Sequence, residues 1–240
     1  MKVREIYDIL DEISPFELQE SWDNSGLQVG NFNDEIKKIV LSLDIDFEFL
    51  ASMEPKTLIV THHPLIFKPL KNLDFSNYPA NLIKELIKKE SSLISMHTNF
   101  DKTHLNSFVA KDILGFQSSI CEDFICYFNV DFYFDDFVKF IKKSFNLKTV
   151  KYVKAKDRIK KVALTTGAGG SLIKEVDADL FLTGDIKYHD AMEAKSIGLS
   201  LIDIEHFASE RYFGEVLASQ LKKNKIEAII SSTKNPFDYM

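Results

Sequence analysis

The chain has 240 residues, of which 45% are hydrophobic and 28% charged, so it can bury the core of one large or two small globular domains. Its formal net charge of −6 gives no overall attraction to phosphate backbones, and we expect no nucleic-acid binding. No segment approaches the roughly 18 consecutive apolar residues of a membrane span, and the N-terminus lacks a secretory signal, which predicts a cytoplasmic protein. Two cysteines, Cys121 and Cys126, are too few for a disulfide framework and are expected to be thiols.

The first half of the chain alternates between helical and extended patterns. Val3, Ile6 and Leu10 recur at helical spacing within residues 2–12. A polar, glycine-bearing segment, 20–30, then predicts a loop with a short strand. Further on, we expect strands at 39–43, 58–61 and 93–96, and helices at 47–53, 81–89 and 104–114. Such alternation is typical of a parallel sheet with crossover helices.

The second half repeats this alternation after a less regular stretch, 116–134. We expect helices at 134–145, 170–176, 186–195 and 207–222, and strands at 161–165, 179–182, 199–204 and 226–230. No long linker interrupts the chain, so domain boundaries are predicted at crossings near residues 100 and 190. The predicted fold class is α/β with two lobes and largely parallel sheets. Residues 1–100 plus 190–240 form the first lobe, and residues 101–189 form the second.

Three of the predicted strands end in histidine. The strand at 58–61 runs into His62 and His63, the next into His97, and the strand at 199–204 leads to His206. Functional groups gather at the carboxyl ends of parallel strands because the loops there converge on one crevice. We therefore expect these imidazoles to share one surface.

Two carboxylates accompany the histidines. Asp101 follows His97 by four residues, and Glu210 follows His206 by four, about one helical turn. Taken singly, the aspartate can be a helix cap, and the glutamate can simply be favoured by the helix dipole. Convergence of three strand ends instead favours a mixed nitrogen and oxygen site for zinc, manganese, iron or nickel. Two such cations suit hydrolysis, because they lower the pKa of a water and hold substrate oxygens.

Other residues bear on this hypothesis. His97 is either a supporting group or a proton shuttle, since imidazoles titrate near neutrality. Residues 165–171 follow a strand and contain glycines whose amides can bind an anion, although tight turns use such glycines equally often. Asp185 and His189 follow the strand at 179–182, and the sequence leaves open whether they act in catalysis.

Five separated segments form a specific set across essentially the whole chain: 21–30, 61–65, 97–101, 183–189 and 206–210. In these segments the chain resembles the GTP cyclohydrolase 1 type 2 homologue family, also called the NGG-interacting-factor-three-like proteins. The resemblance implies two α/β lobes, a dinuclear metal site in the cleft between them and a toroidal homohexamer. The metal ligands that it implies are His62, His63, Asp101, His206 and Glu210, with Glu210 contacting both metals. Glu205 departs from the family pattern, in which glycine is the common residue before the last histidine.

These observations predict a metal-dependent hydrolase that uses two divalent cations per chain on a nucleotide or another small anionic metabolite. His97 and Glu210 are its expected catalytic residues. The family name implies hydrolytic opening of the GTP imidazole ring with loss of formate. The alternative is a non-enzymatic metal carrier or a partner-binding ring with the same ligands, and a third interpretation is that the histidines merely cap strands. The sequence does not select the physiological substrate, the native metal or the subunit contacts.

Overall fold

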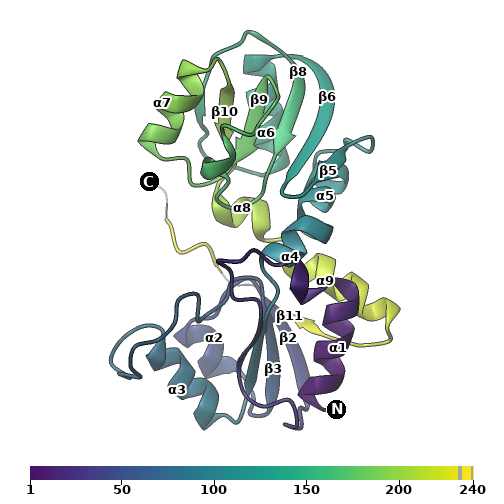
Figure 1. The fold of residues 1–240 in the computed structure, drawn as a ribbon, viewed down its shortest axis with the longest axis vertical. Helices are drawn as coiled ribbons and strands as arrows, with labels where there is room; N and C mark the ends of the chain where they lie inside the picture. Colours follow the sequence, from purple (N-terminus) through teal and green to yellow (C-terminus); the bar gives the residue numbers. More distant parts are fainter. Residues whose placement is uncertain (232–233, 239) are drawn as a thin grey trace. The chain divides into compact units, whose positions relative to one another are not determined.

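The computed structural model describes residues 1–231, 234–238 and 240, and the chain divides into two compact units (Figure 1). Unit 1 comprises Met1–Phe100 and Phe213–Lys234, and unit 2 comprises Asp101–Tyr212 and Asn235–Met240. Residues 190–212, which the sequence patterns assign to the first lobe, belong to unit 2. The reason is that their strand, Ser200–Asp203, hydrogen bonds to two strands of that unit.

Unit 1 is built on a five-stranded sheet with the order β1-β4-β3-β2-β11. Its strands are β1 (Gly26–Val29), β2 (Lys38–Ser42), β3 (Thr57–Thr61), β4 (Ser92–Ser95) and β11 (Ile229–Ile230). All neighbouring pairs are parallel except β1 with β4. Every residue of β3 and β4 is buried, which explains the apolar residues in the middle of both strands. In the parallel register Thr61 pairs with Ser95, so the carboxyl ends of β3 and β4 are adjacent.

Helices cover both faces of this sheet. They are α1 (Val3–Ile13), α2 (Phe47–Ser52), α3 (Ala80–Lys88) and α9 (Phe213–Lys223), with a short turn of helix, α4 (Thr98–Phe100), after β4. Figure 1 shows α2 and α3 on one face and α1 and α9 on the other. Leu50 of α2 and Leu86 of α3 belong to one buried cluster with Ile59 and Leu93 of the sheet. The predicted helices at 2–12, 47–53 and 81–89 are confirmed to within about two residues.

Unit 2 has a six-stranded mixed sheet with the order β5-β6-β8-β9-β10-β7. Its strands are β5 (Ile120–Glu122), β6 (Ile125–Tyr133), β7 (Lys151–Val153), β8 (Arg158–Leu164), β9 (Leu180–Thr183) and β10 (Ser200–Asp203). The strands β8, β9 and β10 are parallel, whereas β5, β6 and β7 pair antiparallel. The sequence patterns missed β6, although Cys126, Phe128, Val130 and Phe132 alternate along it and contact one core cluster.

The two faces of this sheet carry different cores. The helices of unit 2 are α5 (Asn106–Phe108), α6 (Phe134–Ser144), α7 (Tyr188–Ser196) and α8 (His206–Glu210), with π-helical turns at Asp101–Leu105 and Val109–Ile113 and a 3-10 turn at Gly170–Leu172. Phe137 of α6 shares a cluster with Leu180, whereas Ala194 of α7 shares another with Phe181, the next residue of β9. The expected helix at 207–222 is divided into α8 and α9, and the expected helix at 170–176 is reduced to the 3-10 turn. Within the described residues, no helix has the length and apolar character needed to cross a membrane.

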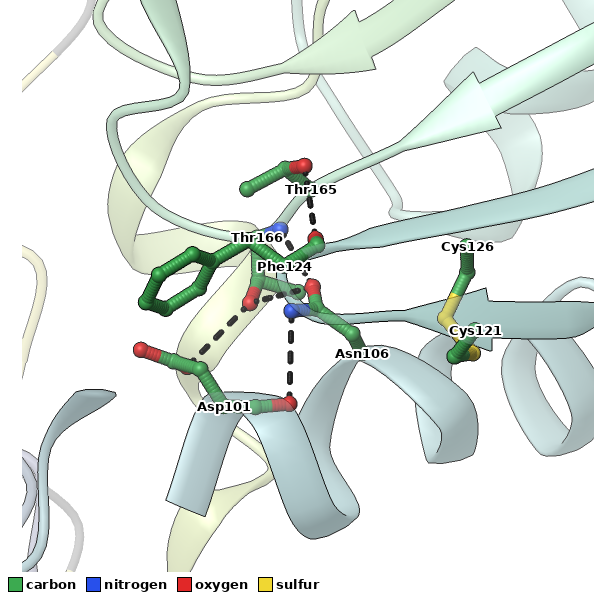
Figure 2. Close-up of a disulfide and its surroundings, with 7 residues drawn as sticks. All are labelled: Asp101, Asn106, Cys121, Phe124, Cys126, Thr165 and Thr166. Atoms are coloured by element: carbon green, nitrogen blue, oxygen red, sulfur yellow. Dashed lines mark hydrogen bonds between the residues drawn. A yellow bond between two sulfur atoms is a disulfide. The ribbon is translucent and has the colours of Figure 1, made fainter. Parts of the chain in front are cut away.

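Cys121 and Cys126 form a disulfide, so the expectation that both are thiols is wrong (Figure 2). The two residues face each other directly in the register of β5 and β6. Their separation along the chain does not reveal this hairpin, whereas the pairing of the two strands brings the sulfurs together. At the turn of the hairpin, the Phe124 carbonyl oxygen accepts a hydrogen bond from the Thr165 hydroxyl.

Candidate metal centre

Unit 1 brings three histidines together at the carboxyl ends of β3 and β4. His62 and His63 follow β3, and His97 follows β4 by two residues. One nitrogen from each ring lies within 4.8 Å of the corresponding nitrogens of the other two, close enough for a shared metal ion. Because parallel strands β3 and β4 are neighbours, the sheet itself brings residues from two parts of the chain into one cluster.

Oxygen atoms fix the orientation of the first two rings. His62 Nδ1 lies 2.9 Å from the carbonyl oxygen of Met96, and this oxygen can only accept a hydrogen bond. His63 Nδ1 lies 3.0 Å from each carboxylate oxygen of Asp44, the second residue after β2. In the neutral imidazoles the proton is therefore on Nδ1, and Nε2 is the nitrogen that can bind a metal. Metal-ligating histidines are commonly oriented in this way.

Asp23 holds the third ring. Its fully buried side chain accepts hydrogen bonds from His97 Nδ1 at 2.8 Å, from the Asn24 amide at 2.7 Å and from the Thr98 amide at 3.1 Å. Burial raises the pKa of Asp23, but its hydrogen bonds, above all with His97, hold the pKa well below the usual range. The carboxylate thus stays charged and directs Nε2 of His97 away from itself. Sequence reasoning missed Asp23, which lies in the polar loop before β1.

Unit 2 contributes a histidine and a glutamate from one face of α8. His206 Nε2 lies 2.9 Å from Glu210 Oε2, and His206 Nδ1 lies 2.7 Å from Asp185 Oδ2. Burial lowers the pKa of His206, but hydrogen bonds and charges from Glu210 and Asp185 outweigh it and raise the pKa to about 9. The His206 proton therefore balances two carboxylates at neutral pH. A divalent cation can replace that proton among the same groups.

Asp101 begins the first π-helical turn and is buried within a network of polar side chains (Figure 2). The Thr166 hydroxyl lies 3.4 Å from Asp101 Oδ1 and 2.9 Å from Asn106 Oδ1. Asn106 also accepts from the Thr166 amide at 2.7 Å and donates to the Asp101 carbonyl oxygen at 3.3 Å. These contacts fix Asp101 against the loop that follows β8.

Two amides of the glycine-bearing loop after β8 donate hydrogen bonds within the chain. The amide of Gly167 donates to the Ser209 hydroxyl at 3.0 Å, and the amide of Gly169 donates to the Thr183 hydroxyl at 2.7 Å. The loop also brings the backbone of Gly167 close to the Glu210 carboxylate. A Cβ at Gly167 would lie 2.0 Å from Glu210 Oε1, and the φ angle of +64° also favours glycine there.

Of the two candidates that the sequence left open, Asp185 contacts a potential metal ligand and His189 does not. Asp185 contacts His206 directly, so it belongs to the histidine and glutamate group. His189 is exposed on α7, where its ring contacts Tyr188, and it joins none of the potential metal-binding groups among the described residues. Glu205 has a φ of +60°, the left-handed conformation that glycine adopts without strain. The structure as a whole contains groups of histidine, aspartate and glutamate side chains able to bind a metal ion, and this donor set suits borderline divalent metals.

Known proteins resemble the chain along its whole length. The family Duf34/NIF3 (NGG1p interacting factor 3) matches residues 1–236. A Campylobacter jejuni protein named GTP cyclohydrolase 1 type 2 homolog is 49% identical over 240 residues and is covered completely, as is this chain. A Helicobacter pylori protein named GTP cyclohydrolase 1 type 2 is 44% identical, with 98% of this chain and 97% of the relative covered.

Solved structures agree with these matches. A Staphylococcus aureus crystal structure has a TM-score of 0.87 at 26% identity and covers 100% of this chain and 99% of its own. The reduced form of HcgD from Methanocaldococcus jannaschii has a TM-score of 0.81 at 29% identity, with 96% and 97% covered. The chain therefore belongs to the Duf34/NIF3 family.

Proposed function

We propose that this protein is a metal-dependent hydrolase that acts on a nucleotide or a related anionic metabolite. In this proposal His62, His63, Asp101, His206 and Glu210 bind two divalent cations, such as zinc, iron, manganese or nickel. The observation that carries the proposal is the orientation of the four histidines, including His97: each Nδ1 lies within hydrogen-bond distance of an oxygen atom of the chain. In each ring, Nε2 is therefore the nitrogen that can bind a metal ion or accept a proton.

Candidate ligands of both units lie near points at which the chain passes from one unit to the other. His97 lies four residues before Asp101, and Glu210 lies three residues before Phe213. The ring of Phe213 in turn packs against His62 within unit 1, with 5.1 Å between the ring centroids. His97 and Asp101, and likewise Glu210 and Phe213, thus lie on either side of two of the three peptide connections between the units.

The residues of the chain have distinct parts in the proposed reaction. The two cations, when bound, supply Lewis acidity and lower the pKa of a water. Asp23 keeps His97 in the tautomer whose Nε2 accepts a proton, so His97 can take a proton from the attacking water and return it to the leaving group. Asp44 and Asp185 hold His63 and His206 in position through their Nδ1 atoms.

The substrate class rests on the relatives, since proteins 44–49% identical are named for GTP cyclohydrolase activity or homology to it. The proposal accordingly takes GTP as the first substrate to test, with formate release as the assay. Assembly into a homohexameric ring and a location in the cytoplasm also belong to the proposal.

The test is metal analysis together with activity. Protein purified without chelator is expected to contain two divalent cations per chain and to release formate from GTP. Glu210→Gln removes the carboxylate charge with little change of shape, and we expect at least a 100-fold loss of activity together with reduced metal content. The matched control is Glu215→Gln, because Glu215 is an exposed glutamate on α9.

Two outcomes would contradict the proposal in different ways. Full activity of Glu210→Gln would show that this glutamate is not part of the metal centre. Two bound cations without hydrolysis of GTP or of a panel of other nucleotides would favour the metal carrier. In that case Asp23→Asn is expected to leave metal exchange unchanged, because a carrier does not need a proton shuttle.

A further inference from the structure

Two exposed aromatic rings lie beside His97 in unit 1, and the proposed chemistry does not use them. Trp22 is 57% exposed and Phe67 is 42% exposed. Their ring centroids are 6.1 Å apart, and they lie 6.3 Å and 6.2 Å, respectively, from the ring centroid of His97. On the buried side, His97 contacts His62 at 5.2 Å and His63 at 5.6 Å. The His97 ring therefore contacts both the other two candidate histidines and a pair of partly exposed aromatic rings.

Hydrogen bonds fix the two aromatic segments to each other. Asn24, two residues after Trp22, donates from its side chain to the Ile66 carbonyl oxygen at 2.6 Å. The Ile66 amide donates to the Gln28 side chain at 3.2 Å. Asp23, next to Trp22, is held by its own contacts with His97. The two partly exposed rings thus lie on segments that hydrogen bonds join to each other.

A pocket continues from Phe67. It has a volume of about 370 Å³ and is lined by segment 64–80, beginning at Pro64 directly after His63. This volume is within the range of about 300–1,000 Å³ that is typical of small-molecule sites. Lys68 and Lys71 line it, and among the residues that the structure describes neither is paired with a carboxylate. The one lining carboxylate, Asp74, accepts hydrogen bonds from its neighbours Ser76 and Asn77.

We propose that Trp22 and Phe67 bind the planar heteroaromatic ring of the substrate beside His97, and that Lys68 and Lys71 bind its phosphate groups. This inference rests on the proposed function, because it assigns the substrate of the same site. Aromatic side chains stack on a base through its π face, and lysines attract phosphate as point charges. The arrangement assigns a nucleotide rather than a sugar phosphate or a polyphosphate alone, since only a nucleotide has both groups.

The chain provides its own probe for this assignment. Trp22 is the single tryptophan, so its fluorescence reports only on this position. Purified protein is titrated with GTP, guanosine, ribose 5-phosphate and inorganic tripolyphosphate, with correction for absorbance by guanine. We expect saturable quenching by GTP and by guanosine, and none by the two compounds without a ring.

Substitutions separate the ring contacts from the phosphate contacts. Phe67→Leu is expected to weaken the binding of both GTP and guanosine at least fivefold, the lower end of base-stacking effects. Phe47→Leu is the matched control, because Phe47 is 54% exposed on α2 of the same unit. Lys68→Ala combined with Lys71→Ala is expected to weaken GTP binding about tenfold and to leave guanosine binding unchanged.

The results decide this inference separately from the proposed function. Quenching by tripolyphosphate equal to that by GTP, or full affinity of Phe67→Leu for guanosine, would overturn the aromatic site. Saturable quenching by GTP without any hydrolysis would support the aromatic site and count against the hydrolase. Hydrolysis of GTP that is lost in Glu210→Gln but unchanged in Trp22→Leu and Phe67→Leu would support the hydrolase and count against the aromatic site.

Discussion

The two units hold their metal-binding candidates by different physical means. In unit 1, imidazoles follow adjacent parallel strands, and side-chain or carbonyl oxygens orient each ring through Nδ1. In unit 2, Glu210 and His206 lie on a short helix, and the backbone at Gly167 approaches the carboxylate directly. Both units thus orient histidines through acceptors at Nδ1, as Asp185 does for His206, but unit 2 adds close packing of backbone against a charged side chain.

The largest effect on stability is expected at Gly167, where a side chain would collide with the Glu210 carboxylate. Gly167→Ala places a Cβ 2.0 Å from Glu210 Oε1 at a φ of +64°. We expect a loss of about 3 kcal/mol in the free energy of unfolding, from overpacking and left-handed strain together. Urea unfolding measures it, and metal content should fall as well because Glu210 is displaced.

A matched control separates the two causes. Gly115 has a φ of +82°, but a Cβ at this position would meet nothing within 4 Å, so Gly115→Ala carries the conformational cost alone. It should cost about 1 kcal/mol, with unchanged metal content. Equal destabilisation by the two substitutions would show that contact with Glu210 is not the reason for glycine at position 167.

The corresponding substitution in unit 1 is Asp23→Asn. It keeps the shape of the side chain but removes the charge that fixes the His97 tautomer, and we expect a loss of hydrolytic rate of about 10-fold to 100-fold at unchanged metal content. Asp44→Asn should have a smaller effect, because the Asp44 side chain is 57% exposed whereas that of Asp23 is fully buried. Rate measurements at full metal occupancy test this order, and a reversed order would contradict the part assigned to His97.

The disulfide of unit 2 should matter for stability and not for the metal centre. Replacing both Cys121 and Cys126 by serine removes a short covalent loop, for which chain entropy accounts for about 2 kcal/mol. Calorimetry should show a Tm lower by a few degrees. Metal content should be unchanged, because Asp101 is held by Asn106 and Thr166. Loss of metal on reduction would instead link the hairpin to the site.

The smallest expected effect is the pH dependence due to His206. Its pKa is about 9 in the folded chain, above the usual value of about 6.5. Protonation therefore stabilises the metal-free fold fully below about pH 6.5, and this stabilisation is lost as the pH rises through about 9. Solvent screening keeps it small, since a third of the side chain is exposed.

Urea unfolding of metal-free protein between about pH 6.5 and about pH 9.5 measures this contribution. His206→Gln should flatten the decline in stability, whereas His189→Gln, at an exposed position on α7, should retain it. An identical decline in both variants would assign the pH dependence to other groups.

Much of the fold follows from periodicity. The helix at residues 3–13 and the buried strands β3 and β4 were predictable because their apolar spacing is regular and their ends carry clear breaking residues. The hairpin β5–β6 was missed although apolar residues alternate along β6, because Tyr127 and Tyr133 place further aromatic residues between the alternating positions.

The candidate site was partly predictable for the same kind of reason. His62, His63 and His97 follow strands, so the rule for parallel sheets predicts that they meet. Asp23 could not be found in this way, since it lies in a loop before an antiparallel edge strand and becomes important only through its contact with His97. The sequence left the part of the loop after β8 open, because glycines that bind anions and glycines that admit a neighbouring side chain look the same.

The sequence by itself determined the alternating α/β elements, the strand-end histidines and the His206 to Glu210 spacing, because local periodicity and chain separation fix these features. Only the tertiary structure decided which oxygens orient each ring, why Gly167 has no side chain, and that Cys121 meets Cys126. The physical reason is that each of these depends on contacts between residues that are distant in sequence or paired across strands, and such contacts leave no periodic signal in the chain.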